Sequence, residues 1–238
     1  MQIKFFEEKK FVDRLVLDPL GDGISSLELI RVSGSDLDIV NAARVSFGKM
    51  ADEISPKDES LIKYLLEHDH TSPFEHNQFS FRVKAPIYVV RQWMRHRMAS
   101  YNEISYRYVQ APLEFYVPSN WRWQDKDNKQ SSFGAYKDSD VLDGYKKTLN
   151  FAAKIYLELI EKGVCREQAR GVLPVCTYTE FIYSCNLHSL MHFLKLRLHP
   201  HAQYEIRVFA EGLLKLVLPH FPIALREWEK LNNINLRN

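Results

Sequence analysis

Apolar residues recur along the chain at two spacings, one typical of helices and one typical of strands. Spacings of three and four residues predict five longer helices, over residues 36–45, 55–70, 141–163, 187–197 and 201–218. A spacing of two predicts strands over residues 14–20, 27–34, 76–86 and 175–186. In the third of these strands Phe79, Phe81 and Val83 share a face that we expect to be buried. Long helices mixed with short alternating strands indicate an α+β fold in one domain over residues 1–238, with a mixed or antiparallel sheet.

Residues with special backbone preferences mark the ends of several elements. Ser35, Ser55 and Asn186 stand directly before helical patterns, where their side chains can cap a helix N-terminus. Pro86 is expected to end the third strand and to open a helix over residues 87–99.

The stretch between the middle elements, residues 109–140, is the least regular part of the chain. Residues 114–118 could form a strand, whereas residues 120–140 are polar, lack a period and predict a loop or an insertion. Trp121 and Trp123 in this loop could stack on an aromatic ligand or could fill a contact between subunits. After the long helix, a short helix is expected over residues 166–172.

Charge balance and cysteine content narrow the class of protein. The formal net charge is +2, which is too small to suggest a general nucleic-acid binder. The three cysteines form no CxxC pair, and their odd number favours reduced thiols over a disulfide framework. Charged residues interrupt the N-terminal stretch, and no apolar run approaches the roughly 20 residues that cross a bilayer. These features predict a soluble cytoplasmic protein.

Basic residues are nevertheless concentrated between positions 82 and 107. A local basic site in a nearly neutral protein favours a small anionic ligand over a long polyanion. The chain has no GxGxxG after a strand and no GxxxxGK[ST], so the sequence supports neither a Rossmann cradle nor a Walker-type loop. With only nine glycines available, phosphates would have to be held by arginines, hydroxyls and helix N-termini.

Residues 95–108, RHRMASYNEISYRY, combine cations, hydroxyls, an amide and an acid. Ser100, Asn102, Ser105 and Tyr106 offer groups suited to phosphate, sugar or base edges. Glu103 would repel a phosphate, so we interpret it as an acceptor for a ligand hydroxyl or as the partner that orients an arginine. This mixture predicts a nucleotide site rather than a site for a bare anion.

Other residues leave alternatives open. His188 and His192 are four apart on a predicted helix, as metal ligands can be, but neither an HExxH arrangement nor a close third ligand accompanies them. Polar or π contacts to a ligand are therefore favoured over a metal. Cys185 directly precedes Asn186, where a thiol could be activated, although a small buried residue explains it better. Ser72 at a turn or helix start could contact a phosphate.

The segment RHRMASYNEISYR fits the RHRxxSxNExSxR signature of the flavin-dependent thymidylate synthases, and the chain resembles this family, also called ThyX. Further similar segments follow in the family order between about residues 30 and 220: HTSPFEH, APIYVVRQWMRHR, REQARGVLP, NLHSLMHFLKLR and HAQYEIR. Two features depart from the family pattern. His188 stands where many members carry arginine, and residues 119–139 have no clear counterpart, which suggests an insertion.

The resemblance implies a homotetramer of α+β subunits that binds FAD without a Rossmann motif and forms its active sites between subunits. It implies conversion of dUMP to dTMP, with 5,10-methylenetetrahydrofolate giving the carbon and NADPH giving electrons through the flavin. FAD contacts are implied for Ser72, Arg95, His96, Arg97, Glu103, Asn186, Leu187, His188 and His192. Contacts to dUMP are implied for Gln92, Trp93, Met94 and Arg95 of one subunit, for Glu103, Ile104, Ser105, Tyr106 and Arg107 of another, and for Arg170 and Arg197.

Arg197 is the catalytic candidate that this resemblance implies. A fixed cation near the uracil ring would stabilise negative charge developing at N3 and O2. C5 would then become nucleophilic without a covalent enzyme adduct, so no catalytic cysteine is expected. Because His188 and His192 lack a close third ligand, no metal is expected either. Neither a nucleic acid nor a membrane is expected as a partner. Two alternatives remain at this point: a binder of single-stranded nucleic acid built on the arginine and tyrosine stretch, and a cysteine-dependent thymidylate synthase with an essential thiol.

Overall fold

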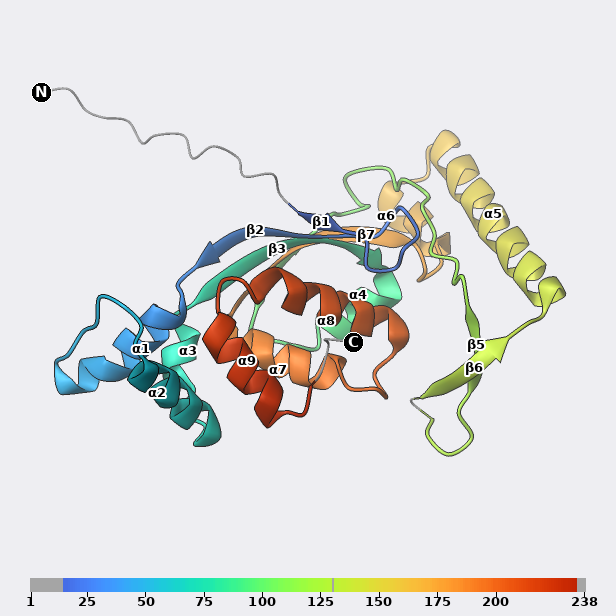
Figure 1. Cartoon of the computed structure of the whole chain (residues 1–238). Helices are drawn as coiled ribbons and strands as arrows, with labels where there is room; N and C mark the ends of the chain where they lie inside the picture. Colours follow the sequence, from blue (N-terminus) through green and yellow to red (C-terminus); the bar gives the residue numbers. More distant parts are fainter. Residues whose placement is uncertain (1–14, 130, 235–238) are drawn as a thin grey trace, which may run out of the picture.

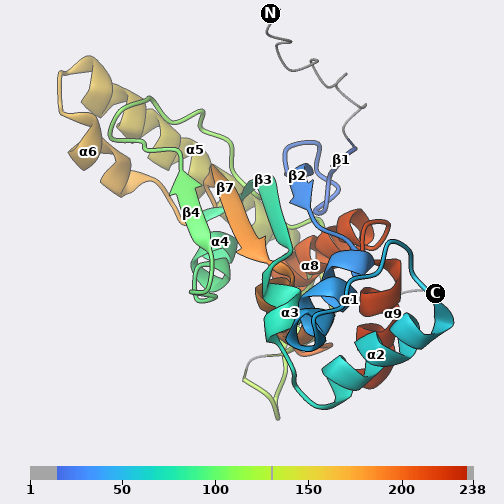
Figure 2. The same cartoon turned by 90° about the vertical axis from the view of Figure 1, so that its left-hand side faces the viewer.

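A five-stranded antiparallel sheet forms the centre of the computed structural model, which describes residues 15–129 and 131–234. Its strands lie side by side in the order β1-β2-β3-β7-β4 (Figure 2). They are β1 (Val16–Leu17), β2 (Ser26–Ser33), β3 (Gln78–Pro86), β4 (Ser100–Glu103) and β7 (Tyr178–Asn186). The α+β class and three of the predicted strands are confirmed. The strand predicted over 14–20 is shorter than expected, and residue 14 lies outside the described residues.

Helices cover one face of the sheet and extend beyond both of its ends (Figure 1). Below the sheet lie α7 (Leu187–Arg197), α8 (Tyr204–Val217) and α9 (Pro222–Leu231). At one end are α1 (Asp36–Arg44), the 3-10 helix η1 (Val45–Phe47), α2 (Pro56–Glu67) and α3 (Ser72–Glu75). At the other end α4 (Ile87–Trp93) follows β3, and α5 (Ser139–Glu161), α6 (Arg166–Ala169) and the 3-10 helix η2 (Arg170–Val172) lie beyond it.

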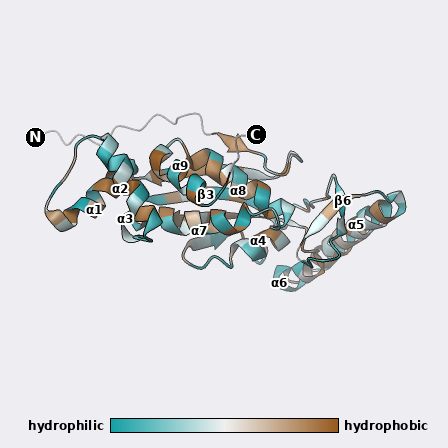
Figure 3. Ribbon diagram, turned by 60° about the horizontal axis from the view of Figure 1, so that its bottom comes forward, coloured by the Kyte–Doolittle hydropathy of each residue, from teal (hydrophilic) through white to brown (hydrophobic). Residues whose placement is uncertain are grey.

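The two faces of the sheet differ in polarity. Phe79, Phe81 and Val83 of β3 are at most 1% exposed and face the helices, as predicted. On the opposite face Ser80 of β3 and Ser184 of β7 hydrogen-bond at 2.9 Å. The helices are amphipathic to match, and teal and brown residues alternate along α5 and α9 in Figure 3. Within the described ranges, no helix is both long enough and apolar enough to cross a membrane.

The helix predicted over residues 87–99 is wrong in its second half. It ends at Trp93, and the chain then turns and enters β4, which pairs with the otherwise open edge of β7. Tyr101 explains the change, because its ring stacks on Tyr183 at 5.4 Å and its hydroxyl donates to the carbonyl of His96 at 2.7 Å. Pairing with β4 satisfies the backbone N–H and C=O groups on the edge of β7, which a continued helix would have left unpaired. The residues between Trp93 and β4 therefore form a loop.

The prediction of a loop over residues 120–140 is also wrong. This segment forms a hairpin of β5 (Trp121–Gln124) and β6 (Ser132–Tyr136), although its polar composition hid the pairing. Trp121 packs edge-on against Tyr145 of α5 at 5.1 Å. The strand expected over residues 114–118 is reduced to one bridge, between Phe115 and Thr177, and helix α9 was not predicted.

The predicted caps have mixed outcomes. Ser55 forms a capping box with Asp58, and the Asn186 side chain accepts from the Ser189 N–H at 2.8 Å at the start of α7. Ser35 occupies the N-cap position of α1, but its hydroxyl donates to the Asp38 carboxylate instead of accepting from the backbone. The cap at Asn186 fixes where α7 begins and therefore where its last residue, Arg197, is presented.

Candidate active site

Arg197 is a half-buried cation at the C-terminal end of α7. Its Nε donates to Nε2 of His96 at 3.0 Å, and its Nη2 donates to the carbonyl of Gln92 at 3.4 Å. Burial lowers the pKa of the guanidinium, which nevertheless stays charged at neutral pH. Within the described part of the chain it forms no ion pair with a carboxylate. Because a half-buried charge needs a partner, this arrangement favours binding of an anion or of developing negative charge.

His96 supports Arg197 as a neutral acceptor. Burial, followed by the nearby charges of Arg197 and His192, lowers the pKa of His96 to about 4. Its ring packs on Phe193 at 4.6 Å, which holds the imidazole in place. Since Nε2 accepts from Arg197, the proton of the neutral ring lies on Nδ1. The histidine therefore orients the guanidinium without neutralising its charge.

A cavity of about 680 Å³ opens beside this pair and has a basic lining without any carboxylate. Its polar lining residues are Arg95, His96, Arg97, His188, Ser189, His192 and Arg197. Arg95 and Arg97 project from the turn between α4 and β4, and both are exposed. The structure thus brings together five of the residues predicted to bind FAD, from two segments about 90 residues apart in the sequence.

Two more cavities adjoin this one. A cavity of about 340 Å³ shares His188 and His192 with it and is bordered by Thr71, next to the predicted phosphate contact Ser72. Ser72 itself is exposed at the start of α3. A larger cavity of about 1260 Å³ shares Arg197. Its other polar lining residues are Gln92, Lys129, Lys195, His199, His201, Gln203, Asn232 and Asn233.

The remaining predicted nucleotide contacts lie apart from these cavities. Glu103 of β4 accepts from the Thr179 hydroxyl at 2.6 Å. Arg107 pairs with Glu167 of α6 at 3.2 Å, close in sequence to Arg170 of η2. Like Ile104 and Ser105, none of these residues lines any of the three cavities. One chain therefore assembles one part of the predicted site and presents the other part on a separate surface.

Packing limits how three of the residues predicted to contact a ligand could do so. Trp93 is fully buried between rings that include Phe193 at 4.9 Å and Phe181 at 5.5 Å. Leu187 is also fully buried, and Tyr106 is 8% exposed with its hydroxyl donating to the carbonyl of Tyr178. The side chains of Trp93 and Leu187 therefore belong to the core of this chain. Met94 is half-buried against the core, and Asn186 uses its side chain as the α7 cap.

Metal and thiol chemistry gain no support from the geometry. The described residues contain no group of three or more metal-binding side chains, so His188 and His192 remain a pair. Cys185 is 4% exposed, and burial raises the pKa of its thiol to about 12. Burial also raises the pKa of Cys176, whereas Cys165 is exposed at the start of α6. A buried thiol that resists ionisation is a poor nucleophile.

Several residues around the site were not identified from the sequence. They include Gln203 and Glu205, which hydrogen-bond to each other at 2.9 Å, and Arg122, which pairs with Glu205. A signal was present, because Glu205 occupies an inward position one helical turn before the buried Phe209. A carboxylate among apolar positions of an amphipathic helix usually has a buried partner.

The comparisons with known proteins agree with one another. A family model described as thymidylate synthase complementing protein matches residues 28–223. A flavin-dependent thymidylate synthase from Thermus thermophilus is 49% identical over 204 residues, covering 86% of this chain and 75% of the relative. Another, from Wolbachia pipientis, is 45% identical over 203 residues, covering 83% and 71%.

A solved structure shows the same architecture. The UMP/dUMP methylase PolB from Streptomyces cacaoi, bound with 5-Br dUMP, superposes with a TM-score of 0.80 at 37% identity, covering 87% of this chain and 95% of that one. The signature segment, the matched family model and these relatives together show that the chain belongs to the flavin-dependent thymidylate synthase family.

Proposed function

We propose that this enzyme methylates dUMP to dTMP for nucleotide biosynthesis, with FAD as bound cofactor, 5,10-methylenetetrahydrofolate as carbon donor and NADPH as reductant. The observation that carries the proposal is Arg197, a half-buried cation without a carboxylate partner among the described residues, where two basic cavities meet. The names of the flavin-dependent relatives and the methylase structure with bound 5-Br dUMP support the cofactor and the substrate class.

The residues around the cavity of about 680 Å³ fit the phosphates of FAD. Arg95 and Arg97 could each donate several hydrogen bonds to phosphate oxygens, and no carboxylate in the lining would oppose them. His96, His188 and His192 would add polar and π contacts. Ser72, Glu103, Asn186 and Leu187 are proposed as further contacts, the last through its main chain. When bound, the flavin would carry electrons from NADPH to the transferred carbon.

The division of the predicted site between two surfaces supports a homotetramer with shared active sites. Gln92, Met94, Arg95 and Arg197 would approach dUMP from one subunit, together with the main chain of Trp93. Residues that lie away from Arg197 in one chain would approach from a neighbour: Glu103, Ile104, Ser105, Tyr106, Arg107 and Arg170. The exposed Arg107 and Arg170 would then meet the nucleotide phosphate.

Arg197 would act on the uracil ring. Two of its five N–H groups are held by neutral acceptors, His96 and the Gln92 carbonyl, so its direction is fixed and its charge is undiminished. Its other N–H groups can stabilise negative charge at N3 and O2 as C5 becomes nucleophilic. No enzyme thiol is required in this scheme. We place the enzyme in the cytoplasm, where free cysteines such as these three are stable.

A single preparation tests the proposed function. The purified protein is expected to be yellow, with flavin absorbance between about 350 and 500 nm, and to release FAD on denaturation. Supplied with dUMP, 5,10-methylenetetrahydrofolate and NADPH, it is expected to form dTMP, measured by chromatography. A protein that stays colourless after incubation with FAD, and that forms no dTMP, would contradict the proposal.

Cys185→Ala is expected to leave kcat for dTMP formation within about twofold of the wild type. The thiol is buried and its pKa is raised to about 12, so it is not available as a nucleophile. Loss of one buried sulfur should lower stability by about 1 kcal/mol or slightly more. Steady-state rates at a temperature well below the melting transition check this. Complete loss of activity in a folded, yellow variant would restore the mechanism that uses an essential thiol.

A further inference from the structure

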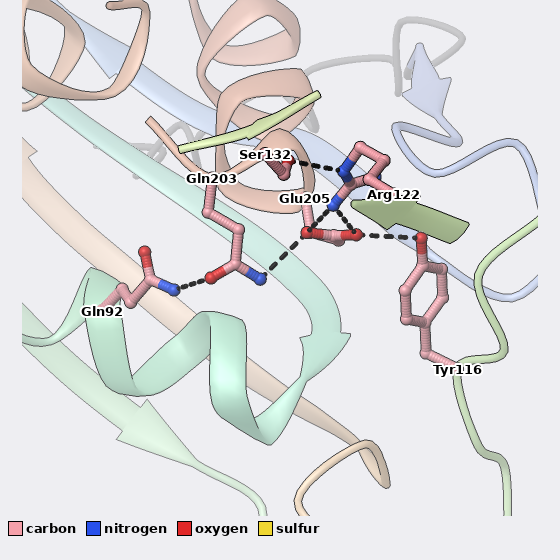
Figure 4. A network of polar contacts seen from close by, with 6 residues as sticks. All are labelled: Gln92, Tyr116, Arg122, Ser132, Gln203 and Glu205. Carbon is pink, nitrogen blue, oxygen red and sulfur yellow. Dashed lines mark hydrogen bonds and ion pairs between the residues drawn. The ribbon is translucent and has the colours of Figure 1, made fainter. Parts of the chain in front are cut away.

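A buried carboxylate anchors a chain of hydrogen bonds that leads toward the candidate site (Figure 4). The Glu205 side chain, in the first turn of α8, is 3% exposed. Arg122 of β5 donates from Nη2 to both of its oxygens, at 2.9 and 3.2 Å. The Tyr116 hydroxyl approaches one of these oxygens at 3.5 Å. A carboxylate in such an ion pair only accepts hydrogen bonds, so its neighbours must donate to it.

This carboxylate dictates the orientation of two amide side chains. Gln203 must turn its Nε2 to Glu205, and it donates to Oε2 at 2.9 Å. Its Oε1 is then the atom that faces Gln92, and it accepts from Nε2 of Gln92. Each amide is fixed by the one before it, since an amide presents a donor on one side and an acceptor on the other. In the described part of the chain, Oε1 of Gln92 receives no hydrogen bond.

Gln92, the last member of the hydrogen-bond series, lines the same cavity as the catalytic candidate Arg197. Gln92, Gln203 and Arg197 all line the cavity of about 1260 Å³. The main-chain carbonyl of Gln92 also accepts from Nη2 of Arg197 at 3.4 Å. Gln92 therefore contacts Arg197 through its main chain and faces the cavity with its side-chain amide. A rotation of the Gln92 amide would exchange an acceptor for a donor in this cavity.

The position of the Glu205 carboxylate depends on the β5–β6 hairpin. Arg122 is the hairpin residue that pairs with Glu205, and its Nε donates to the Ser132 hydroxyl on the neighbouring strand at 3.0 Å. Its guanidinium also lies over the Tyr204 ring, with 5.1 Å to the centroid. These contacts hold the cation over the start of α8. The β5–β6 hairpin thus contributes a specific charge near the site.

We propose that Arg122, Glu205 and Gln203 are positioning residues that fix the Gln92 amide with Oε1 available as an acceptor for an N–H or O–H donor of the bound nucleotide. The uracil N3–H and the sugar hydroxyl are the donors of this kind in dUMP. Glu205 supplies the direction of the hydrogen bonds, and Arg122 holds the Glu205 carboxylate in place through its ion pair. This inference rests on the proposed function, because it assumes that dUMP occupies the cavity beside Gln92.

Glu205→Gln tests the direction of the chain, because the new amide can donate to Gln203 and so permits both amides to turn over. We expect the KM for dUMP to rise roughly 3- to 10-fold, the effect of one hydrogen bond, with kcat and flavin content within about twofold of wild type. Gln203→Met interrupts the chain without touching the ion pair and is expected to have the same effect. Arg122→Met should raise the KM for dUMP in the same way. Arg122→Lys, which keeps the cation, should bring the KM most of the way back to the wild-type value.

A double-mutant cycle separates positioning from a general loss of structure. In a Gln92→Met background, Glu205→Gln and Gln203→Met are each expected to change the KM by less than about twofold. Arg44→Met is the matched control, since Arg44 pairs with Asp58 at 27% and 1% side-chain exposure, against 26% and 3% for Arg122 and Glu205. It should leave the KM unchanged.

An unchanged KM in both Glu205→Gln and Gln203→Met, or a full additional effect in the Gln92→Met background, would overturn the inference. A wild-type enzyme that forms no dTMP would instead overturn the proposed function, so the two failures are distinguishable.

Discussion

Arg197→Ala is expected to lower kcat for dTMP formation by about 10²- to 10³-fold, the usual cost of removing one group that stabilises charge in a transition state. The folded state should tolerate the change. Only two hydrogen bonds are lost, to His96 and to the Gln92 carbonyl, each contributing about 0.5–1.5 kcal/mol. Loss of a half-buried charge partly offsets this cost. Turnover with saturating dUMP, flavin content and the melting temperature should be measured on the same preparation.

Two further variants show whether the position of the charge matters. Arg197→Lys keeps a cation but loses the fixed fork held by His96, so it should recover only part of the rate. Arg226→Ala removes an exposed arginine from α9 and should leave kcat unchanged. Full activity in a flavin-loaded Arg197→Ala enzyme would remove Arg197 from the mechanism.

The parts of the fold that the sequence predicted well are those where local and long-range preferences agree. β3 alternates cleanly because one face meets the helices and the other is polar. Helix α7 begins directly after Asn186 because the Asn186 side chain satisfies a free N–H of its first turn. β4 could not be predicted in this way. Its four residues come directly after a stretch with a helical pattern. They form a strand only because the edge of β7 is open to them.

Prediction of the candidate site followed the same division. Similarity to a known family identified Arg95, His96, Arg97 and Arg197, and the fold brings them together across a long sequence separation. It could not show that the Trp93 side chain belongs to the core, because burial depends on residues that pack from β7, α7 and α8.

The hydrogen-bond series that ends at Gln92 could not be predicted from the sequence for a related reason. Arg122, Gln203 and Glu205 come from segments about 80 residues apart, and each alone resembles an ordinary surface or helix residue. Only the hairpin, which polar composition disguised as a loop, brings the cation to the carboxylate. Composition describes a segment by itself, whereas ion pairs of this kind are a property of the assembled fold.

Replacing both Arg95 and Arg97 by methionine is expected to produce a colourless protein that keeps its fold. Both side chains are exposed and form no ion pair within the described residues, so little stability depends on them. Each charge-assisted hydrogen bond to phosphate is worth about 1.5–3 kcal/mol, so their joint loss should weaken FAD binding by about 100-fold or more. Flavin fluorescence during titration with FAD measures the Kd directly.

The matched control for this variant is Arg91→Met, which removes an equally charged, exposed arginine from α4 that lines none of the three cavities. It should keep its flavin and its colour. If Arg91→Met lowered FAD affinity as much as the double variant does, general basic charge would explain the binding. A selective effect of Arg95 and Arg97 requires the phosphates to lie in the cavity beside His96. The turn between α4 and β4 would then place Arg95 and Arg97 at the same cavity, whereas a continued helix would point these two arginines to different sides.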